Sequence, residues 1–282
     1  MKIKLCAFAD EADSSLEGQI RALNRNNIGY IELRGVNGKN ISLITEDEAK
    51  EAKRMLDEGG IRVWSVGSPI GKIAISGDLV AHLELLRHIC TLANIFECKR
   101  VRMFSFYEAY EAEEKVMEML SLMVKIADEY GVTLCHENEK GIYGDTKERI
   151  LRIMSGIDGL SYVYDPANFI ECGEYPSVTL DALADKMEYF HIKDALISGG
   201  IVPAGYGDGE IPKLVSKINR DTVLSIEPHL RIFTGYSEFD STEMKELFTF
   251  SSNDEAFDAA VSAIKKVLTN AGYRECGKEF IK

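Results

Sequence analysis

Two kinds of segment alternate along the chain, and their hydrophobic spacing predicts strands followed by helices. Short runs rich in branched and aromatic residues, typical of buried strands, are Ile3–Ala9, Tyr30–Leu33, Arg62–Val66, Arg100–Phe104, Val132–Glu137, Ser161–Tyr164, Tyr189–Ile192 and Thr222–Glu227. Longer stretches whose apolar residues recur at helical spacing lie near Leu16–Asn26, Glu46–Glu58, Leu79–Phe96, Ala112–Tyr130, Lys147–Met154, Val178–Ala184, Ile211–Ile218 and Asn253–Ala271. This repeated alternation predicts one parallel sheet wrapped by helices.

The second helical stretch shows how sharply the residues mark its ends. Thr45 precedes it, and Glu48 follows three residues later, which is a capping-box pattern. Gly59 and Gly60 come after its last apolar position, and glycines commonly end helices there. Local chemistry therefore predicts a helix that begins after Thr45 and ends before Gly59.

The fold class that we predict is α/β, a single-domain (β/α)₈ TIM barrel that covers residues 1–282. The polar residues 273–282 are expected to be a peripheral tail. A doubly wound open sheet is the alternative. Against it, the turn after the first strand, Phe8–Glu11, lacks the glycine-rich phosphate loop of that fold.

Charge narrows the range of partners. The chain has 33 basic and 46 acidic residues, so its formal net charge is −13. Such a balance repels nucleic acid and anionic lipid. We therefore expect a small-molecule partner, no nucleic acid and no membrane, and a homo-oligomer stays open.

The cysteines and the hydropathy indicate a cytoplasmic protein. None of the six cysteines forms a CxxC pair, and several lie in apolar stretches, which is typical of reduced thiols. The apolar run at the N-terminus is too short for a signal peptide. No stretch approaches the roughly 18 apolar residues of a membrane span.

Four consecutive predicted strands place chemically active side chains at their carboxyl ends, where TIM barrels hold their catalytic groups. These residues are Glu137, Asp165, His191 and Glu227. Three converging carboxylates would repel one another in a desolvated interior, and a divalent cation relieves this cost. One nitrogen and three carboxylates suit Mn²⁺, Mg²⁺ or Co²⁺, with Zn²⁺ as a further option. The pattern therefore predicts one divalent-metal site.

The segments around these residues resemble the sugar phosphate isomerase/epimerase superfamily, the xylose isomerase-like TIM barrels. The resemblance rests on His136–Glu139, Tyr164–Asn168, His191–Asp194 and Ile226–Pro228, and it extends to Tyr30–Arg34 and Ser68–Lys72. It implies that Glu137, Asp165, His191 and Glu227 are the metal ligands. It also implies that Glu137 and Glu227 are the catalytic acid/base pair.

The function that this resemblance implies is a metal-dependent isomerase or epimerase of a small sugar, sugar acid or sugar phosphate. Such an enzyme moves a proton through a metal-stabilised enediolate. One alternative is a keto-inositol-type dehydratase on the same metal site, and another is a non-catalytic sugar-binding barrel. A DNA-repair endonuclease of the superfamily is disfavoured, because the chain is acidic and has only five histidines.

Six further residues are candidates for substrate binding: Asn168, Lys193, Lys72, Arg102, Glu32 and His229. Asn168 stands where the epimerases of the superfamily carry a histidine, and an amide can still hydrogen-bond a hydroxyl. Two structural alternatives stay open. Lys193 could pair with Asp194 or with a neighbouring acid, and Glu32 could pair with Arg102.

Two other features complete the expectations. His136 precedes Glu137 on a strand, so its side chain should point away from the barrel interior and be structural. The glycine-rich segment Gly205–Glu210 resembles the turn that follows the His-x-Lys-Asp segment in the superfamily. We expect it to be a mobile loop over the barrel mouth.

Overall fold

The first strand of the chain pairs with the last barrel strand, and this pairing closes the sheet. The computed structural model describes residues 1–230 and 248–282. Within them, the barrel consists of eight parallel strands: β1 (Lys2–Ala7), β2 (Tyr30–Leu33), β5 (Arg62–Gly67), β6 (Arg100–Met103), β7 (Thr133–Glu137), β8 (Ser161–Tyr164), β9 (Met187–Ile192) and β12 (Thr222–Ile226). The predicted TIM barrel is confirmed.

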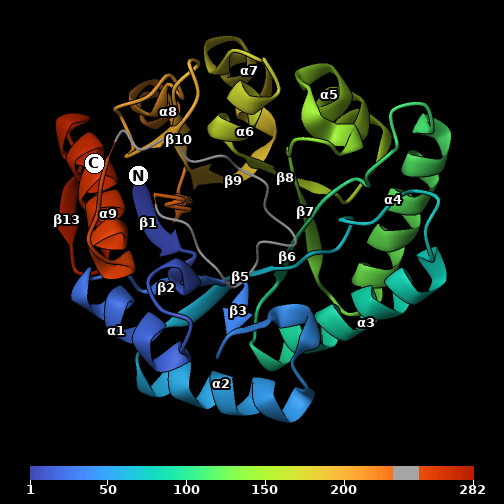
Figure 1. The fold of residues 1–282 in the computed structure, drawn as a ribbon, viewed down its shortest axis with the longest axis horizontal. Coiled ribbons are helices and arrows are strands. Elements are labelled where there is room, and N and C mark those ends of the chain that lie inside the picture. Colours follow the sequence, from blue (N-terminus) through green and yellow to red (C-terminus); the bar gives the residue numbers. More distant parts are fainter. Residues whose placement is uncertain (231–247) are drawn as a thin grey trace.

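Helices surround the barrel, as Figure 1 shows down its axis. They are α1 (Leu16–Arg25), α2 (Glu46–Glu58), α3 (Leu79–Ile95), α4 (Glu113–Glu129), α5 (Lys147–Gly156), α6 (Pro166–Glu171), α7 (Pro176–Leu183), α8 (Ile211–Lys217) and α9 (Asn253–Asn270). The capping box at Thr45 and Glu48 is present, with both of its hydrogen bonds formed. None of the helices in the described part of the chain is both long and apolar enough to span a membrane.

Short elements that the hydrophobic pattern did not predict lie between the main ones. They are the hairpins β3 (Gly35–Val36) with β4 (Lys39–Asn40) and β10 (Asp194–Ala195) with β11 (Ile201–Val202), and the 3₁₀ turns η1 (Ala9–Glu11), η2 (Ile41–Leu43), η3 (Tyr143–Asp145) and η4 (Ala184–Lys186). These elements are too short to show a hydrophobic period.

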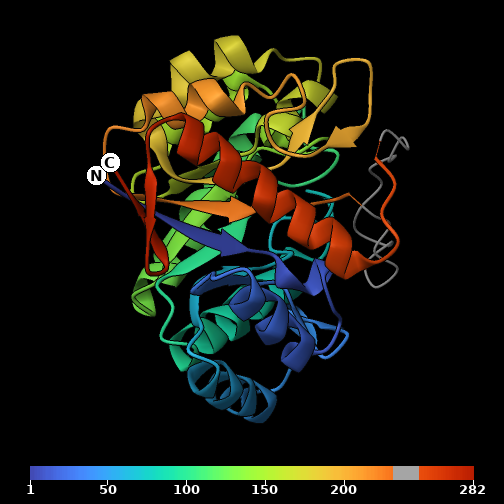
Figure 2. The ribbon, with the colours of Figure 1, turned by 90° about the vertical axis from the view of Figure 1, so that its left-hand side faces the viewer.

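The C-terminal tail folds into a third hairpin, β13 (Arg274–Cys276) with β14 (Glu279–Ile281). β14 runs antiparallel to β1 beside Lys2, Ile3 and Lys4, before β2 begins to pair with β1 at Cys6. The two chain ends therefore lie side by side (Figure 2), and the Met1 ammonium donates a hydrogen bond to the Lys282 carbonyl at 3.3 Å.

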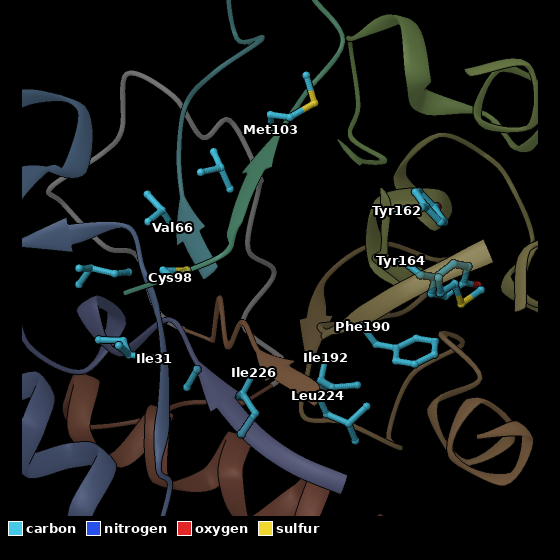
Figure 3. Close-up of a cluster of buried hydrophobic side chains, with 14 of the residues drawn as sticks. Ile31, Val66, Cys98, Met103, Tyr162, Tyr164, Phe190, Ile192, Leu224 and Ile226 are labelled. Carbon is cyan, nitrogen blue, oxygen red and sulfur yellow. The ribbon is translucent and has the colours of Figure 1, made fainter. Parts of the chain in front are cut away.

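Two separate apolar clusters follow from the alternation of side chains along the strands. The larger cluster fills the space between the strands and the helices, and Figure 3 shows part of it. Its labelled members include Ile31, Ile192 and Ile226. The smaller cluster occupies the barrel interior and consists of Cys6, Cys135, Val163, Tyr189 and Val223.

The positions of these interior residues decide which side chains reach the barrel mouth. Residues two places further along the same strands also point inward. On β7, Cys135 is thus followed by Glu137, and on β9 Tyr189 is followed by His191. Apolar layers therefore close the barrel floor, and polar groups lie on top of them.

Candidate metal centre

The four predicted ligands come together at the carboxyl ends of four neighbouring strands. Glu137 ends β7, Asp165 follows β8, His191 lies in β9 and Glu227 follows β12. Each offers one ligand atom, and these atoms all lie within 4.8 Å of one another. All four residues are buried.

One nitrogen of His191 faces all three carboxylates. Its Nδ1 lies 2.8 Å from Glu137 Oε1 and 3.6 Å from Glu227 Oε2. The same atom lies 4.0 Å from Asp165 Oδ2. The site therefore has one imidazole nitrogen and three carboxylate oxygens directed at a common volume.

Local backbone structure positions Asp165. Pro166 occupies the first position of α6, and Asp165 caps that helix by accepting a hydrogen bond at Oδ1 from the Asn168 N–H at 2.9 Å. This contact leaves Oδ2 turned into the centre, where it is buried and has no hydrogen-bond partner. The Lys193 ammonium lies 3.2 Å away as an ion-pair partner without making a hydrogen bond. A buried carboxylate oxygen that accepts no hydrogen bond is costly, so the donor set fits a bound cation.

Burial dominates the charge state of Asp165. It raises the pKa of this carboxyl group to about 7, against the opposing effect of Lys193, and the nearby carboxylates Glu227 and Glu137 raise it further. Asp165 is therefore the ligand whose ionisation most depends on added positive charge.

The two glutamates behave in the opposite way. Burial would raise the pKa of Glu137, but His191 and Arg102 outweigh burial and lower it. Burial likewise opposes ionisation of Glu227, but Lys193 leads the surrounding cations that hold its pKa well below the ordinary value. Both carboxylates are therefore ionised near neutral pH.

Lys193 lies inside the centre, as its position two residues after His191 predicts. Its Nζ lies 3.2 Å from Asp165 Oδ2 and 3.2 Å from Glu227 Oε2. These contacts are the predicted ion pairing with a neighbouring acid. The pairing with Asp194 is wrong, because Asp194 points to the other face and accepts hydrogen bonds from backbone N–H groups. Lys193 thus supplies positive charge between two ligands.

Arg102 supports Glu137 rather than Glu32. Its Nε lies 3.2 Å from Glu137 Oε2, and its Nη1 donates to the Ser68 carbonyl at 3.0 Å. The predicted Glu32–Arg102 ion pair is wrong for a reason of register. Glu32 is level with Ser65 on β5, whereas Arg102 is level with Gly67, one interior layer nearer the mouth.

Asn168 contacts the centre through its amide. Its Nδ2 donates to the Asn138 carbonyl at 2.9 Å and lies 3.3 Å from Glu137 Oε1. Asn138 in turn donates to the Asp165 carbonyl at 2.8 Å. Both amides therefore hold the ligand-bearing strand ends β7 and β8 together.

Lys72 and His229 lie at the edges of the site. Lys72 pairs with Glu139 at 3.0 Å, and its Nζ lies 4.5 Å from the centre of the Phe104 ring. The His229 N–H donates to Glu11 Oε2 at 2.7 Å, and its Nδ1 lies 3.8 Å from Glu227 Oε1. Lys72 thus lies beside Glu139, and His229 lies beside Glu11 and Glu227.

Three charged residues near Glu227 were not among the predicted site residues: Arg34, Asp10 and Glu11. Arg34 lies 3.3 Å from Glu227 Oε1 and also pairs with Asp10 and Glu11 at 2.8 and 3.1 Å. Asp10 and Glu11 follow β1, and Arg34 follows β2. The four ligands were predicted because they are polar residues at the carboxyl ends of strands. The same criterion, applied to β1 and β2, would have found Asp10, Glu11 and Arg34.

Glu32 lies behind His191. Its side chain is fully buried, and its carboxylate lies 3.1 Å from His191 Nε2, on the side of the ring opposite to the other three carboxylates. Tyr189 and Ser225, which sequence reasoning also missed, donate to Glu32. The structure therefore brings Glu32 to the ligand set but not to the barrel mouth.

Two further expectations concern residues around the centre. His136 points away from the interior and packs against Gly144, where an added Cβ would lie 2.5 Å from the imidazole Cε1. Its burial lowers the pKa of the imidazole to about 3.

The Gly205–Glu210 segment is anchored, because Asp194 accepts hydrogen bonds from Gly205, Gly207 and Gly209 N–H groups at 2.8, 3.1 and 2.8 Å.

The fold is a closed parallel TIM barrel. The mouth at the carboxyl ends of its strands holds three carboxylates and one imidazole, which form a candidate metal site. A family model described as xylose isomerase-like TIM barrel matches residues 20–268. The chain therefore belongs to the xylose isomerase-like TIM barrel family. A comparison with curated proteins gives no match.

Solved structures share this fold at low sequence identity. A probable 3-DHS dehydratase, AsbF, involved in petrobactin synthesis from Bacillus anthracis is 15% identical, with a TM-score of 0.71 over 94% of this chain and 99% of that chain. An L-ribulose 3-epimerase is 16% identical, with a TM-score of 0.72 over 96% and 95%. A xylose isomerase-like TIM barrel protein from Mycobacterium smegmatis, in complex with magnesium, is 12% identical, with a TM-score of 0.71 over 95% and 97%.

Proposed function

We propose that this protein is a divalent-metal-dependent isomerase or epimerase of a small sugar, sugar acid or sugar phosphate. One observation carries the proposal. Glu137, Asp165, His191 and Glu227 place ligand atoms within 4.8 Å of one another in a buried barrel mouth. Family membership supports it, because several structures of the same fold are sugar epimerases.

Glu137, Asp165, His191 and Glu227 would hold the metal ion. Oxygen-rich ligands with one imidazole favour Mn²⁺, Mg²⁺ or Co²⁺, and Zn²⁺ also accepts this set. When bound, the ion supplies Lewis acidity for charge that develops on two adjacent substrate oxygens. The neighbour that contains magnesium supports a hard divalent ion.

Glu137 and Glu227 are the proposed acid/base pair. Both are ionised near neutral pH, because neighbouring cations outweigh burial and lower the pKa of each carboxyl group. Either can therefore accept a carbon-bound proton. Return of a proton to the opposite face of the same carbon gives epimerisation, and return to the neighbouring carbon gives isomerisation.

Other residues around the centre would orient the substrate. Burial would lower the pKa of Lys193, but Asp165 and Glu227 raise it well above its ordinary value, so the ammonium keeps its proton and donates hydrogen bonds. Asn168, Arg102, Lys72 and His229 are the remaining proposed substrate contacts, with Asn168 and Arg102 holding Glu137 as well. We do not propose this role for Glu32, because His191 lies between Glu32 and Glu137.

Proton exchange tests the proposal directly. The purified protein is stripped with chelator, reloaded with Mn²⁺ or Mg²⁺ and incubated with a panel of ketoses, sugar acids and sugar phosphates in D₂O. We expect metal-dependent incorporation of deuterium at a carbon next to the carbonyl, measured by NMR. Bound metal without any exchange across the panel would reject catalysis and leave the sugar-binding barrel.

The same assay separates isomerisation from dehydration. A dehydratase on this site would release a product lighter by one water molecule, which mass spectrometry detects. The dehydratase of the same fold makes this the second candidate.

A further inference from the structure

The two ring nitrogens of His191 face carboxylates on opposite sides. Nδ1 lies 2.8 Å from Glu137 Oε1 and faces the candidate metal centre. Nε2 lies 3.1 Å from Glu32 Oε2, on the interior side. The side chains of His191 and Glu32 have no solvent-exposed surface, so bulk solvent does not compete for the contact between them.

The Glu32 carboxylate is itself held by side chains from two other barrel strands. The Tyr189 hydroxyl donates to Oε1 at 2.7 Å, and the Ser225 hydroxyl donates to Oε2 at 2.7 Å. The Tyr189 oxygen also lies 3.1 Å from Ser65 Oγ. Strands β2, β5, β9 and β12 therefore all contribute to one buried polar network beneath the centre.

Such a network decides which nitrogen of the imidazole carries hydrogen. An ionised carboxylate can only accept a hydrogen bond, so Nε2 must be the donor toward Glu32. In the neutral imidazole, Nδ1 then has its lone pair directed at the other three carboxylates. Two aromatic rings pack near the imidazole and fix its plane. Phe8 lies 5.2 Å and Tyr189 5.7 Å away, measured between ring centres.

We infer that Glu32 is a positioning residue that holds His191 in its Nε2–H tautomer and turns Nδ1 toward the metal. This inference rests on the proposed metal site. It assigns Glu32 a role through His191 rather than a substrate contact. Partners of this kind in the outer shell typically change metal affinity by 10–100-fold.

Metal affinity of the apoprotein is the first test. We expect Glu32→Gln to weaken Mn²⁺ binding by roughly 10–100-fold, measured by calorimetry. A glutamine keeps the size of the side chain, but its NH₂ group can donate to Nε2 and so favour the wrong tautomer. Tyr189→Phe is the matched control, since it removes one donor to Glu32 but retains the Glu32–His191 contact. We expect its affinity to stay within a few-fold of wild type.

The tautomer of His191 is the second test, and it needs no variant of Glu32. Long-range ¹H–¹⁵N correlation spectra of histidine-labelled, Mg²⁺-loaded protein report which nitrogen of each ring is protonated. The chain has five histidines. The signals that are missing from the spectrum of a His191→Gln variant belong to the His191 ring. We expect hydrogen on Nε2 in wild type. Hydrogen on Nδ1 would overturn the inference even if Glu32→Gln does not fold.

The outcomes distinguish this inference from the proposed function. Failure of wild type to bind any divalent ion rejects the metal site and the role of Glu32 together. Wild-type binding with an unchanged affinity in a folded Glu32→Gln variant rejects only the role of Glu32. A purely structural role would lower the melting temperature of that variant without moving its metal affinity, which also rejects the inference.

Discussion

The carboxylates of Glu137 and Glu227 reach the same side of one imidazole from strands separated by β8 and β9. Their nearest oxygens lie 2.8 and 3.6 Å from His191 Nδ1. Glu137 is held by Arg102 and Glu227 by Lys193 and Arg34, so the two bases have separate cationic supports. This arrangement gives one bound substrate two ionised carboxylates that approach from different parts of the barrel rim.

Removing either base should stop the reaction without unfolding the protein. We expect Glu137→Gln and Glu227→Gln each to lower turnover by roughly a hundredfold to ten-thousandfold, because an amide cannot accept a carbon-bound proton. Deuterium exchange and circular dichroism measure the two properties. Glu139→Gln is the control, since Glu139 pairs with Lys72 outside the four-ligand set. Near-normal exchange in either variant would remove that glutamate from the acid/base pair.

Asp165 should make the metal-free protein less stable as pH rises. Its pKa is raised from 3.8 to about 7, mainly by burial, so the folded state holds a proton that the unfolded state releases. This contribution to the free energy of unfolding is fully present below about pH 4 and is lost as pH rises through about 7.

Asp165→Asn isolates this effect. In chelator, we expect the variant to gain stability relative to wild type between about pH 5 and about pH 8, because the amide has no proton to lose. Urea unfolding at each pH measures the difference. A difference between the two proteins that does not change with pH would show that Asp165 titrates as an ordinary carboxyl group.

Lys193 should compete with the metal for Asp165 and Glu227. At about pH 8, where both carboxylates are ionised, we expect Lys193→Met to bind Mn²⁺ more tightly than wild type does. Without metal, the same variant should lose about 3–5 kcal/mol of stability, because it leaves two buried carboxylates without their shared ammonium.

Lys72→Met provides the comparison for Lys193. It also removes a lysine near the mouth, but its partner Glu139 is not a predicted ligand. Its Mn²⁺ affinity, measured by chelator competition, should match that of wild type. Weaker binding in Lys193→Met than in Lys72→Met would argue that Lys193 assists the metal rather than competes with it.

The glycine-rich turn should depend on Asp194. Asp194 accepts hydrogen bonds from four backbone N–H groups, three of them from Gly205, Gly207 and Gly209. Asp194→Asn keeps one oxygen but turns an NH₂ group toward those donors, and a buried unsatisfied donor costs about 1–3 kcal/mol. We expect faster hydrogen exchange at the three glycine amides, with α2 amides as the unchanged reference. Unchanged protection of the glycines would contradict the anchoring role.

Local chemistry was sufficient to predict most of the fold. The capping box at Thr45 and Glu48 depends on residues three positions apart. The short helix α6, which begins at Pro166, was not predicted. Strand positions followed from short apolar runs with the period of a pleated sheet. The hairpins at Gly35–Asn40 and Asp194–Val202 were missed because two-residue strands carry no such period.

The candidate ligands could be predicted because parallel strands in a barrel bring their carboxyl ends to one rim. The sequence alone therefore determined the barrel, and it determined that Glu137, Asp165, His191 and Glu227 would meet. Side-chain alternation along a strand also determined that Lys193 would join them while His136 would not.

Only the tertiary structure decided how these groups are paired. The register between β2, β5 and β6 places Arg102 one layer above Glu32, so Arg102 meets Glu137 and Glu32 is left beneath His191. Register across a barrel depends on the shear of the closed sheet, to which every strand contributes. A pattern within one strand shows which face a side chain takes, but not its height against residues far away in the chain.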